Sequence, residues 1–429
     1  MTYHAALEFL FGLQKHGIKL GLETTQALLD AVDHPEGRFP SLLIGGTNGK
    51  GSTAALVASV LQAAGHRVGL YTSPHLVEFR ERIRINGEMI SEEAVGELTG
   101  ILRAAMGEAD PTFFEFTTVL AFQHFARQRV DVAVLEVGMG GRFDATNTVT
   151  PLITAITNVS LDHEAYLGST VAAIAGEKAG IIKPGIPVVL GNLASEAGIV
   201  VERIAAQCGS PCVRLGRNMR VSGDPISGFR YEGVRLTYDH LSMPLAGSHQ
   251  LENAACALAM LELATARGIR IAETAVRTGL RAVQWPGRLE AVERDPLLVL
   301  DGAHNPAAAR VLRDYLVRFR VGHPDARVLL VVSIMRDKDR YGLLHVLAPV
   351  ADEVVLTQAN LPRAADLHDL RDAMPAGTPV FEQAAATDAL ALARAHARPQ
   401  DLICVTGSLM LVGEISALLR GCGLSPLRG

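Results

Sequence analysis

SLLIGGTNGKGSTAAL, residues 41–56, joins a short apolar run to a glycine-rich turn and then to a helix-forming segment. Such a turn exposes backbone N–H groups at a helix N-terminus, which suits phosphate. The strict P-loop pattern G-x-x-x-x-G-K-[ST] nevertheless fails, because Ile44 replaces its first glycine and Gly51 directly follows Lys50. The alternative is a tight turn with a solvated lysine. Four glycines and one lysine within residues 45–51 favour a nucleotide site.

The composition is that of an ordinary globular protein. The 429 residues are 48% apolar and 20% charged, enough for two or three domains with proper cores. A net charge of −5 argues against nucleic acid and anionic membranes as partners. The sequence shows neither a signal peptide nor an apolar run of about 18 residues, so no membrane span is expected. Its five scattered cysteines predict unpaired thiols in a reducing cytoplasm.

Apolar runs rich in β-branched residues alternate with helical patterns, which is typical of α/β proteins with mostly parallel sheets. The first alternation predicts a P-loop-type domain over 1–284, in which 213–245 forms a small antiparallel β segment. A second alternation predicts a Rossmann-like α/β domain over 297–429. The polar, Pro-containing stretch 285–296 is interpreted as the linker.

Several polar side chains stand where predicted strands end, the edge at which open α/β sheets bind ligands. Glu136 closes the run VDVAVLE, and its burial implies a metal or a basic partner, the alternative being an ion pair with Arg142. Ser73 and His163 follow two other strands, and each alone is weak evidence for a metal. Lys178, next to Glu177 on a predicted helix, reads by default as a solvated surface residue. In the second domain, LDGAHNP ends a strand with Asp301, His304 and Asn305.

Eleven motifs then occur in the order found in one family. They are GTNGKGST, YTSPHL, FFEF, LEVGMGGRFDATN, LDHEAYLG, EKAGIIKPG, HQLENAACAL, PGRLE, LDGAHNP, MRDKD and TGSLMLVGE. Together, over about residues 20–415, they resemble the folylpolyglutamate synthases, which include bifunctional dihydrofolate synthases and are related to the Mur ligases. The family's own loop reads G-T-x-G-K-G-[ST], so the resemblance implies a nucleotide loop. Met410 departs from the family, where a tyrosine is common.

The resemblance implies a set of site residues. The expected ATP contacts are Gly49, Lys50, Gly51, Ser52, Asn253, Arg288 and Asp301, and the expected Mg²⁺ ligands are Ser73, Glu136 and His163. Lys178 matches a lysine that is carbamylated in the family and can hold a second magnesium. The expected substrate-binding residues are Thr112, Phe113, Phe114, Glu115, Phe143, Asp144 and Ala145. Lys50, Lys178 and His304 are the expected catalytic residues.

The implied activity is ATP-dependent ligation of L-glutamate to dihydropteroate and to reduced folates such as tetrahydrofolate, through an acyl phosphate. Cytoplasmic location and a monomeric state are expected. Polyglutamylation alone is the alternative within the family, and a muropeptide ligase leaves TSPHL and FFEF unexplained. A binding protein switched by ATP hydrolysis is the alternative from another class.

Overall fold

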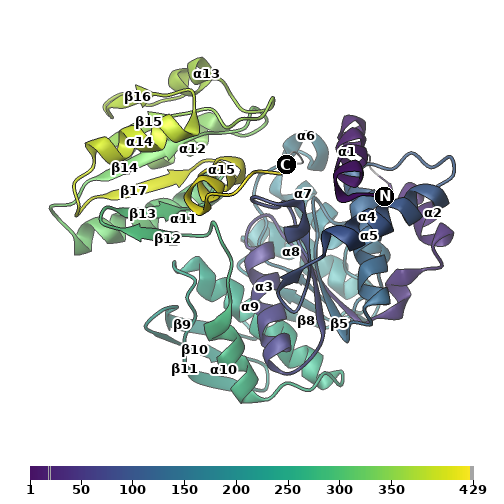
Figure 1. The fold of residues 1–429 in the computed structure, drawn as a ribbon. Helices are drawn as coiled ribbons and strands as arrows, with labels where there is room; N and C mark the ends of the chain where they lie inside the picture. The colour runs from purple at the N-terminus through teal and green to yellow at the C-terminus, as the bar shows by residue number, and fades with distance from the viewer. Residues whose placement is uncertain (18, 20, 426–429) are drawn as a thin grey trace. The chain divides into compact units, whose positions relative to one another are not determined.

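The computed structural model describes residues 1–17, 19 and 21–425, and the chain divides into two compact units (Figure 1). Unit 1 consists of Met1–His75, Phe79–Pro244 and Ser248–Gln284. Unit 2 consists of Leu76–Glu78, Leu245–Gly247 and the chain from Trp285 onward. The two three-residue segments that join unit 2 carry no signal in the sequence.

Unit 1 is built on an eight-stranded sheet in the order β4-β3-β2-β5-β1-β6-β7-β8. Its strands are β1 (Ser41–Gly45), β2 (Val68–Tyr71), β3 (Ile83–Ile85), β4 (Glu88–Met89), β5 (Val132–Glu136), β6 (Ile153–Ile156), β7 (Val188–Leu190) and β8 (Cys212–Arg214). All neighbours pair in parallel except β2 with β3 and β3 with β4. The inner strands are buried throughout, as expected for a sheet covered by helices on both faces.

Helices pack on both sides of this sheet (Figure 1). They are α1 (Tyr3–Leu13), α2 (Glu23–Ala31), α3 (Lys50–Ala63), α4 (Glu92–Ala105), α5 (Phe113–Arg127), α6 (Glu164–Leu167), α7 (Val171–Ala179), α8 (Ser195–Gln207), α9 (His249–Ala266) and α10 (Glu273–Ala282). Short 3₁₀ turns include η3 (Phe79–Arg82) and η4 (Ala145–Thr148). The α3–α10 contact needs Gly279, because a Cβ there would lie 2.4 Å from the Cα of Val60. No helix in the described residues is long and apolar enough to cross a bilayer.

A small antiparallel sheet, β11-β10-β9, completes unit 1. It contains β9 (Arg220–Asp224), β10 (Gly228–Glu232) and β11 (Thr237–Leu241), inside the range predicted for antiparallel strands. Glu262 of α9, which is buried, accepts hydrogen bonds from the backbone N–H groups of Val234 and Leu236, both at 3.2 Å. The carboxylate thereby fixes the β10–β11 turn to the helix.

Unit 2 is a six-stranded sheet in the order β12-β13-β17-β14-β15-β16. Its strands are β12 (Glu290–Arg294), β13 (Leu297–Leu300), β14 (Val328–Val332), β15 (Glu353–Leu356), β16 (Val380–Glu382) and β17 (Leu402–Thr406), and its helices are α11 (Pro306–Gly322), α12 (Arg340–Leu347), α13 (Leu367–Asp372), α14 (Ala386–His396) and α15 (Leu409–Arg420). Only β12 runs antiparallel to its neighbour. Residues 285–296 are therefore not a simple linker, because β12 pairs with β13 and extends the sheet.

Candidate active site

The glycine loop joins β1 to α3 in a conformation that its glycines permit. Gly46 and Gly49 have φ angles of +143° and +81°. A Cβ on Gly46 would lie 2.0 Å from Thr157 Oγ1, and one on Gly49 would lie 2.2 Å from Asn253 Oδ1. Gly49 is the N-cap of α3 and offers no side-chain cap, so the first N–H groups of the helix remain available to an anion.

The side chains of this loop suit phosphate as well. Lys50 Nζ donates to the Thr47 carbonyl at 3.2 Å, which keeps the ammonium group folded over the loop. Ser52 is buried, and the buried Thr53 Oγ1 has no hydrogen-bond partner among the described residues. A helix N-terminus with a lysine and two hydroxyl groups can hold the phosphates of a nucleotide.

Residues that the sequence did not indicate fix the loop in place. The Asn158 side chain accepts from the backbone N–H of Asn48 and donates to the Asn48 carbonyl, each at 2.9 Å. Thr157 Oγ1 donates to the same carbonyl at 2.6 Å, and the backbone N–H of Thr47 donates to the Asn158 carbonyl at 3.0 Å. The loop is thus tied to the chain that follows β6. The polar run TN directly after an apolar strand was the only available signal.

Lys178 is buried, in contrast to the default expectation of a solvated surface lysine. Lys178 lies in α7, and only 4% of the residue is exposed. Its Nζ donates a hydrogen bond to the Gly46 carbonyl at 2.9 Å. Burial lowers the pKa of Lys178 to about 7, and the nearby Lys50 charge acts in the same direction. The carboxylates of Asp162 and Asp144 partly oppose this change. An amine with such a pKa is neutral in a large fraction of molecules at neutral pH.

Glu136 and Ser73, two of the three expected metal ligands, lie together. Glu136 ends β5, is 5% exposed, and accepts a hydrogen bond from the backbone N–H of Ser73 at 3.0 Å. Arg142 does not form the alternative ion pair, because it pairs with Glu177 at 3.3 Å. A buried carboxylate beside a serine offers the hard oxygen ligands that Mg²⁺ prefers, so these residues fit such an ion.

His163, the third expected metal ligand, lies at the start of α6. It adopts a left-handed conformation with φ of +52°, and its Nε2 is 3.9 Å from Asp162 Oδ1. About a third of its side chain is exposed (36%), so the ring is accessible to a ligand. No cluster of three or more His, Cys, Asp or Glu side chains suited to a metal occurs in the described residues. The expected Mg²⁺ ligands include only two side chains of these four types, Glu136 and His163, and the third ligand is Ser73.

The expected substrate segments are held by helix caps. Thr112 and Glu115 form a capping box at the start of α5, with hydrogen bonds of 3.2 Å and 2.7 Å. Asp144 caps η4 by accepting from the Thr146 backbone at 3.0 Å, and burial raises its pKa. The polar groups of these residues therefore organise the backbone. Phe143 is 43% exposed, so its aromatic ring is available to a ligand.

Phe113, Phe114 and Ala145 supply the remaining apolar surface of these segments. Phe113 and Ala145 are buried, and Phe114 is partly buried against Gly138, where a Cβ would lie 2.5 Å from the ring. Asn253, an expected ATP contact, is buried in α9 and donates to Gln250 Oε1 at 2.9 Å. Because Asn253 also faces Gly49, the structure brings it to the glycine loop.

In unit 2 the expected residues gather where β13 ends. Asp301 is buried and accepts from the backbone N–H groups of Leu289 and Ala303 at 2.9 and 3.0 Å. Burial raises its pKa, and the neighbouring Arg288 opposes this change. His304 Nδ1 lies 2.8 Å from the Gly302 carbonyl, which can only accept, so Nδ1 is the donor in this contact.

Both halves of the chain match models of ligase domains. Residues 44–261 match the Mur ligase middle domain, and residues 287–409 match the glutamate ligase domain of Mur ligases. A dihydrofolate synthase/folylpolyglutamate synthase from Bacillus subtilis is 34% identical over 98% of this chain and 99% of its own. The chain belongs to the dihydrofolate synthase/folylpolyglutamate synthase family of Mur ligases.

Solved structures of this family have the same fold. Escherichia coli FolC in complex with DHPP and ADP superposes with a TM-score of 0.90 at 31% identity, and 98% of each chain is covered. The bifunctional folylpolyglutamate synthase/dihydrofolate synthase from Yersinia pestis, complexed with AMPPNP and Mn ion, gives 0.88 at 34% identity and the same coverage. The two-unit α/β architecture predicted from the sequence is thus confirmed as a family property.

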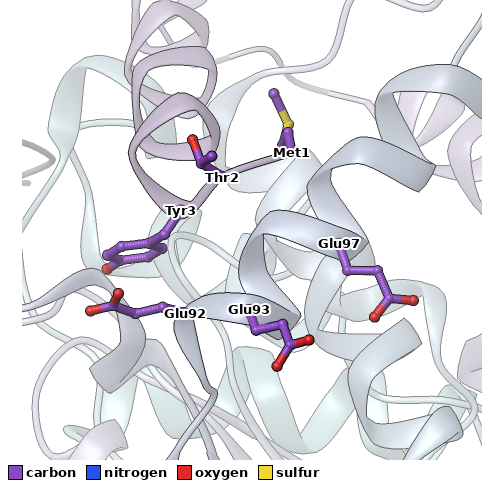
Figure 2. A pocket seen from close by; sticks show the side chains of 6 residues that line it. All are labelled: Met1, Thr2, Tyr3, Glu92, Glu93 and Glu97. Atoms are coloured by element: carbon purple, nitrogen blue, oxygen red, sulfur yellow. The ribbon is translucent and has the colours of Figure 1, made fainter.

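A pocket elsewhere in unit 1 contains none of the expected site residues. It measures about 450 Å³ and is lined by Met1, Thr2, Tyr3, Glu92, Glu93 and Glu97 (Figure 2). Its three glutamates all come from α4 and would repel the phosphates of a nucleotide or the carboxylate of an acid substrate. The charge of this pocket therefore does not suit either anion.

Proposed function

We propose that the protein ligates L-glutamate to dihydropteroate, forming dihydrofolate, and to tetrahydrofolate, forming poly-γ-glutamates, with ATP as co-substrate. The observation that carries the proposal is the meeting of Lys178 with the glycine loop at the carboxyl edge of the main sheet, in a family of ligases. The bifunctional name of the full-length relative favours both activities, and polyglutamylation alone is the alternative.

The reaction needs an activated acid, because a carboxylate is a poor electrophile and hydroxide is a poor leaving group. Transfer of the γ-phosphoryl group of ATP to the carboxylate gives an acyl phosphate and ADP. The free amine of glutamate then attacks the acyl carbon, the C–N bond forms, and phosphate leaves with the C–O bonding electrons. The α3 N-terminus and Lys50 would hold the phosphates and disperse their charge during the transfer.

A divalent cation, when bound, would neutralise phosphate charge further. Ser73, Glu136 and His163 would hold it, which fits the buried carboxylate of Glu136 and its contact with Ser73. Gly49, Gly51 and Ser52 would surround the phosphates, and Asn253 would contact the nucleotide beside Gly49.

Lys178 is proposed to be carbamylated in the active protein. Its lowered pKa leaves much of the amine neutral near pH 7, which is the form that adds CO₂. The modification replaces a buried cation with an anion, and that anion would hold a second divalent cation. The surroundings of Lys178 favour this modification, because a buried lysine beside Lys50 is poorly stabilised as an ammonium group.

The remaining assignments complete the proposed site. Thr112–Glu115 and Phe143–Ala145 would line the site for the pterin acid, with Phe143 offering an exposed ring. In unit 2, Arg288 and Asp301 would contact ATP, and His304, whose Nδ1 lies against the Gly302 carbonyl, would take part in catalysis. Residues 1–284 would form the nucleotide-binding domain and residues 297–429 the second ligase domain. The protein is proposed to act as a monomer in the cytoplasm, where its five free cysteines would stay reduced.

Release of ADP tests the proposal directly. Dihydropteroate and tetrahydrofolate are supplied separately, each with ATP, Mg²⁺ and L-glutamate, and each component is omitted in turn. ADP should appear only when an acid and glutamate are both present. Turnover with tetrahydrofolate alone would reduce the function to polyglutamylation, and ADP release without either acid would contradict the ligase assignment.

A further inference from the structure

Arg82 is a buried cation that none of the assignments above uses. It ends η3, immediately before β3, and only 2% of the residue is exposed. Its Nε donates to His75 Nδ1 at 2.8 Å, and its guanidinium carbon lies 5.0 Å from the centre of the Phe113 ring. Burial lowers the pKa of Arg82, and the charge of Glu136 and of other neighbours opposes the change. The side chain remains a cation, because no arginine in a protein is readily deprotonated.

This cation has no carboxylate partner within the described residues. Glu136 and Glu81 act on it through space, and its Nη1 and Nη2 atoms make no hydrogen bond there. An arginine is rarely buried unless it is paired, since removing its charge from water is costly. Neither terminal nitrogen is among the fully enclosed polar atoms without a partner, so each retains a small accessible surface. Both terminal nitrogens therefore keep donors that no described residue uses.

The surroundings of Arg82 point to the acid substrate. Phe113, on which the guanidinium group lies, belongs to the segment expected to bind the pterin acid, and Phe113 packs edge-on against Phe79 at 6.2 Å. The ring and the His75 contact hold the guanidinium plane in one orientation. A planar cation fixed in this way presents two parallel N–H donors, which match the two oxygens of a carboxylate, or a ring carbonyl oxygen next to a ring nitrogen that carries a lone pair.

We propose that Arg82 is a substrate-binding residue whose two terminal nitrogens donate hydrogen bonds to an acceptor of the carboxylic-acid substrate. The acceptor is either the carboxylate or the carbonyl edge of the pterin ring, which share this chemistry. Phe113 and His75 act as positioning residues for the guanidinium group. The inference rests on the proposed ligase function and deepens it by naming the group that selects the acid.

The test compares R82M and R82K with matched variants of Arg84, a partly buried arginine two residues further on, whose Nε donates to the Glu81 carbonyl at 3.1 Å. Steady-state KM values are measured for dihydropteroate and for ATP, and the dissociation constant of pteroic acid is measured by calorimetry. R82M should raise the KM and the dissociation constant of the acid about 10- to 100-fold, because hydrogen bonds from a charged donor are lost. R82K should fall between R82M and wild type, and the KM of ATP should stay within about twofold in all variants.

The amide of pteroic acid distinguishes the two acceptors. If Arg82 binds the carboxylate, R82M should weaken the acid but leave the amide unchanged; if it binds the pterin edge, both should weaken alike. Either result supports the proposal. Acid affinity in R82M equal to that of R84M would overturn it, as would an equal rise in both KM values, which indicates a structural role.

Folding and the proposed function are controlled separately. If circular dichroism shows that R82M does not fold, the acid affinity of R82K is compared with that of the Arg84 variants instead. A folded R82K that binds the acid as tightly as the wild type would overturn the bidentate contact. A wild-type protein that releases no ADP with acid and glutamate contradicts the proposed function. An active wild type with an unaffected R82M contradicts only the role of Arg82.

Discussion

Replacing Asn158 should weaken nucleotide binding although we do not expect this side chain to touch the nucleotide. In Asn158→Leu, a side chain of similar size removes two hydrogen bonds of 2.9 Å to Asn48 in the glycine loop. Each is worth about 0.5–1.5 kcal/mol net, so the loop loses about 1–3 kcal/mol of stabilisation in its folded arrangement. ADP binding must then restore that arrangement, so the affinity for ADP should fall by about 5- to 150-fold if the whole loss is felt in binding.

Calorimetric titration with ADP and Mg²⁺ measures the affinity, and urea unfolding measures the change in stability. Asn192→Leu is the matched control, because Asn192 follows the next strand, β7, and among the described residues its amide bonds only to Glu252, at 2.9 Å. Asn158→Asp should be at least as harmful as Asn158→Leu, since it places an oxygen against the Asn48 carbonyl and a negative charge near the phosphates. ADP affinity in Asn158→Leu within twofold of the control would refute this account of the loop.

Three further results are expected. Lys50→Ala should abolish ATP-dependent ligation, measured as ADP release, while circular dichroism shows an intact fold; substantial turnover would contradict its role. Glu136→Ala and His163→Ala should each raise the Mg²⁺ concentration needed for half-maximal turnover, and unchanged titrations for both would show that these residues serve structure. In bicarbonate-free buffer, the free energy of unfolding should rise with pH above about 7 because unfolded Lys178 binds a proton that the folded amine with pKa about 7 has released. Lys178→Met should flatten this slope between about pH 7 and the ordinary lysine pKa of 10.5, and an unchanged slope would exclude Lys178 as its source.

The strand-end residues could be predicted from the sequence because they depend on local patterns. Glu136 follows four buried residues of a strand, and parallel strands bring their carboxyl ends to one edge, so its meeting with Ser73 next to the neighbouring strand β2 was foreseeable. The T-x-x-E pattern of Thr112 and Glu115 is likewise typical of the capping box that the structure contains, whereas the family resemblance identifies these residues only as a substrate segment.

The burial of side chains that contact residues far away in the chain could not be predicted from the sequence. Lys178 looked like a surface residue because Glu177 precedes it on an Ala-rich helix, yet its amine meets the Gly46 carbonyl, 132 positions earlier in the chain. Arg82 is similar, since its contact with Phe113 comes from packing between η3 and α5. Asn158 belongs to the polar pair Thr157–Asn158, which matches no motif. Its role is visible only in the folded structure, where it bonds to the glycine loop. Periodicity within one segment carries no information about such contacts.

The discontinuous make-up of unit 2 has a consequence for protein synthesis and for fragment design. Leu76 packs with the apolar core formed by residues such as Leu411 and Val412, although more than three hundred positions separate them along the chain. During translation, residues 76–78 and 245–247 emerge long before the rest of their unit exists. A gene fragment covering 285–429 would lack both segments and would leave apolar surface uncovered. The two units are thus unsuited to expression as independent modules, and substitutions within the full-length chain are the better route to separating their contributions.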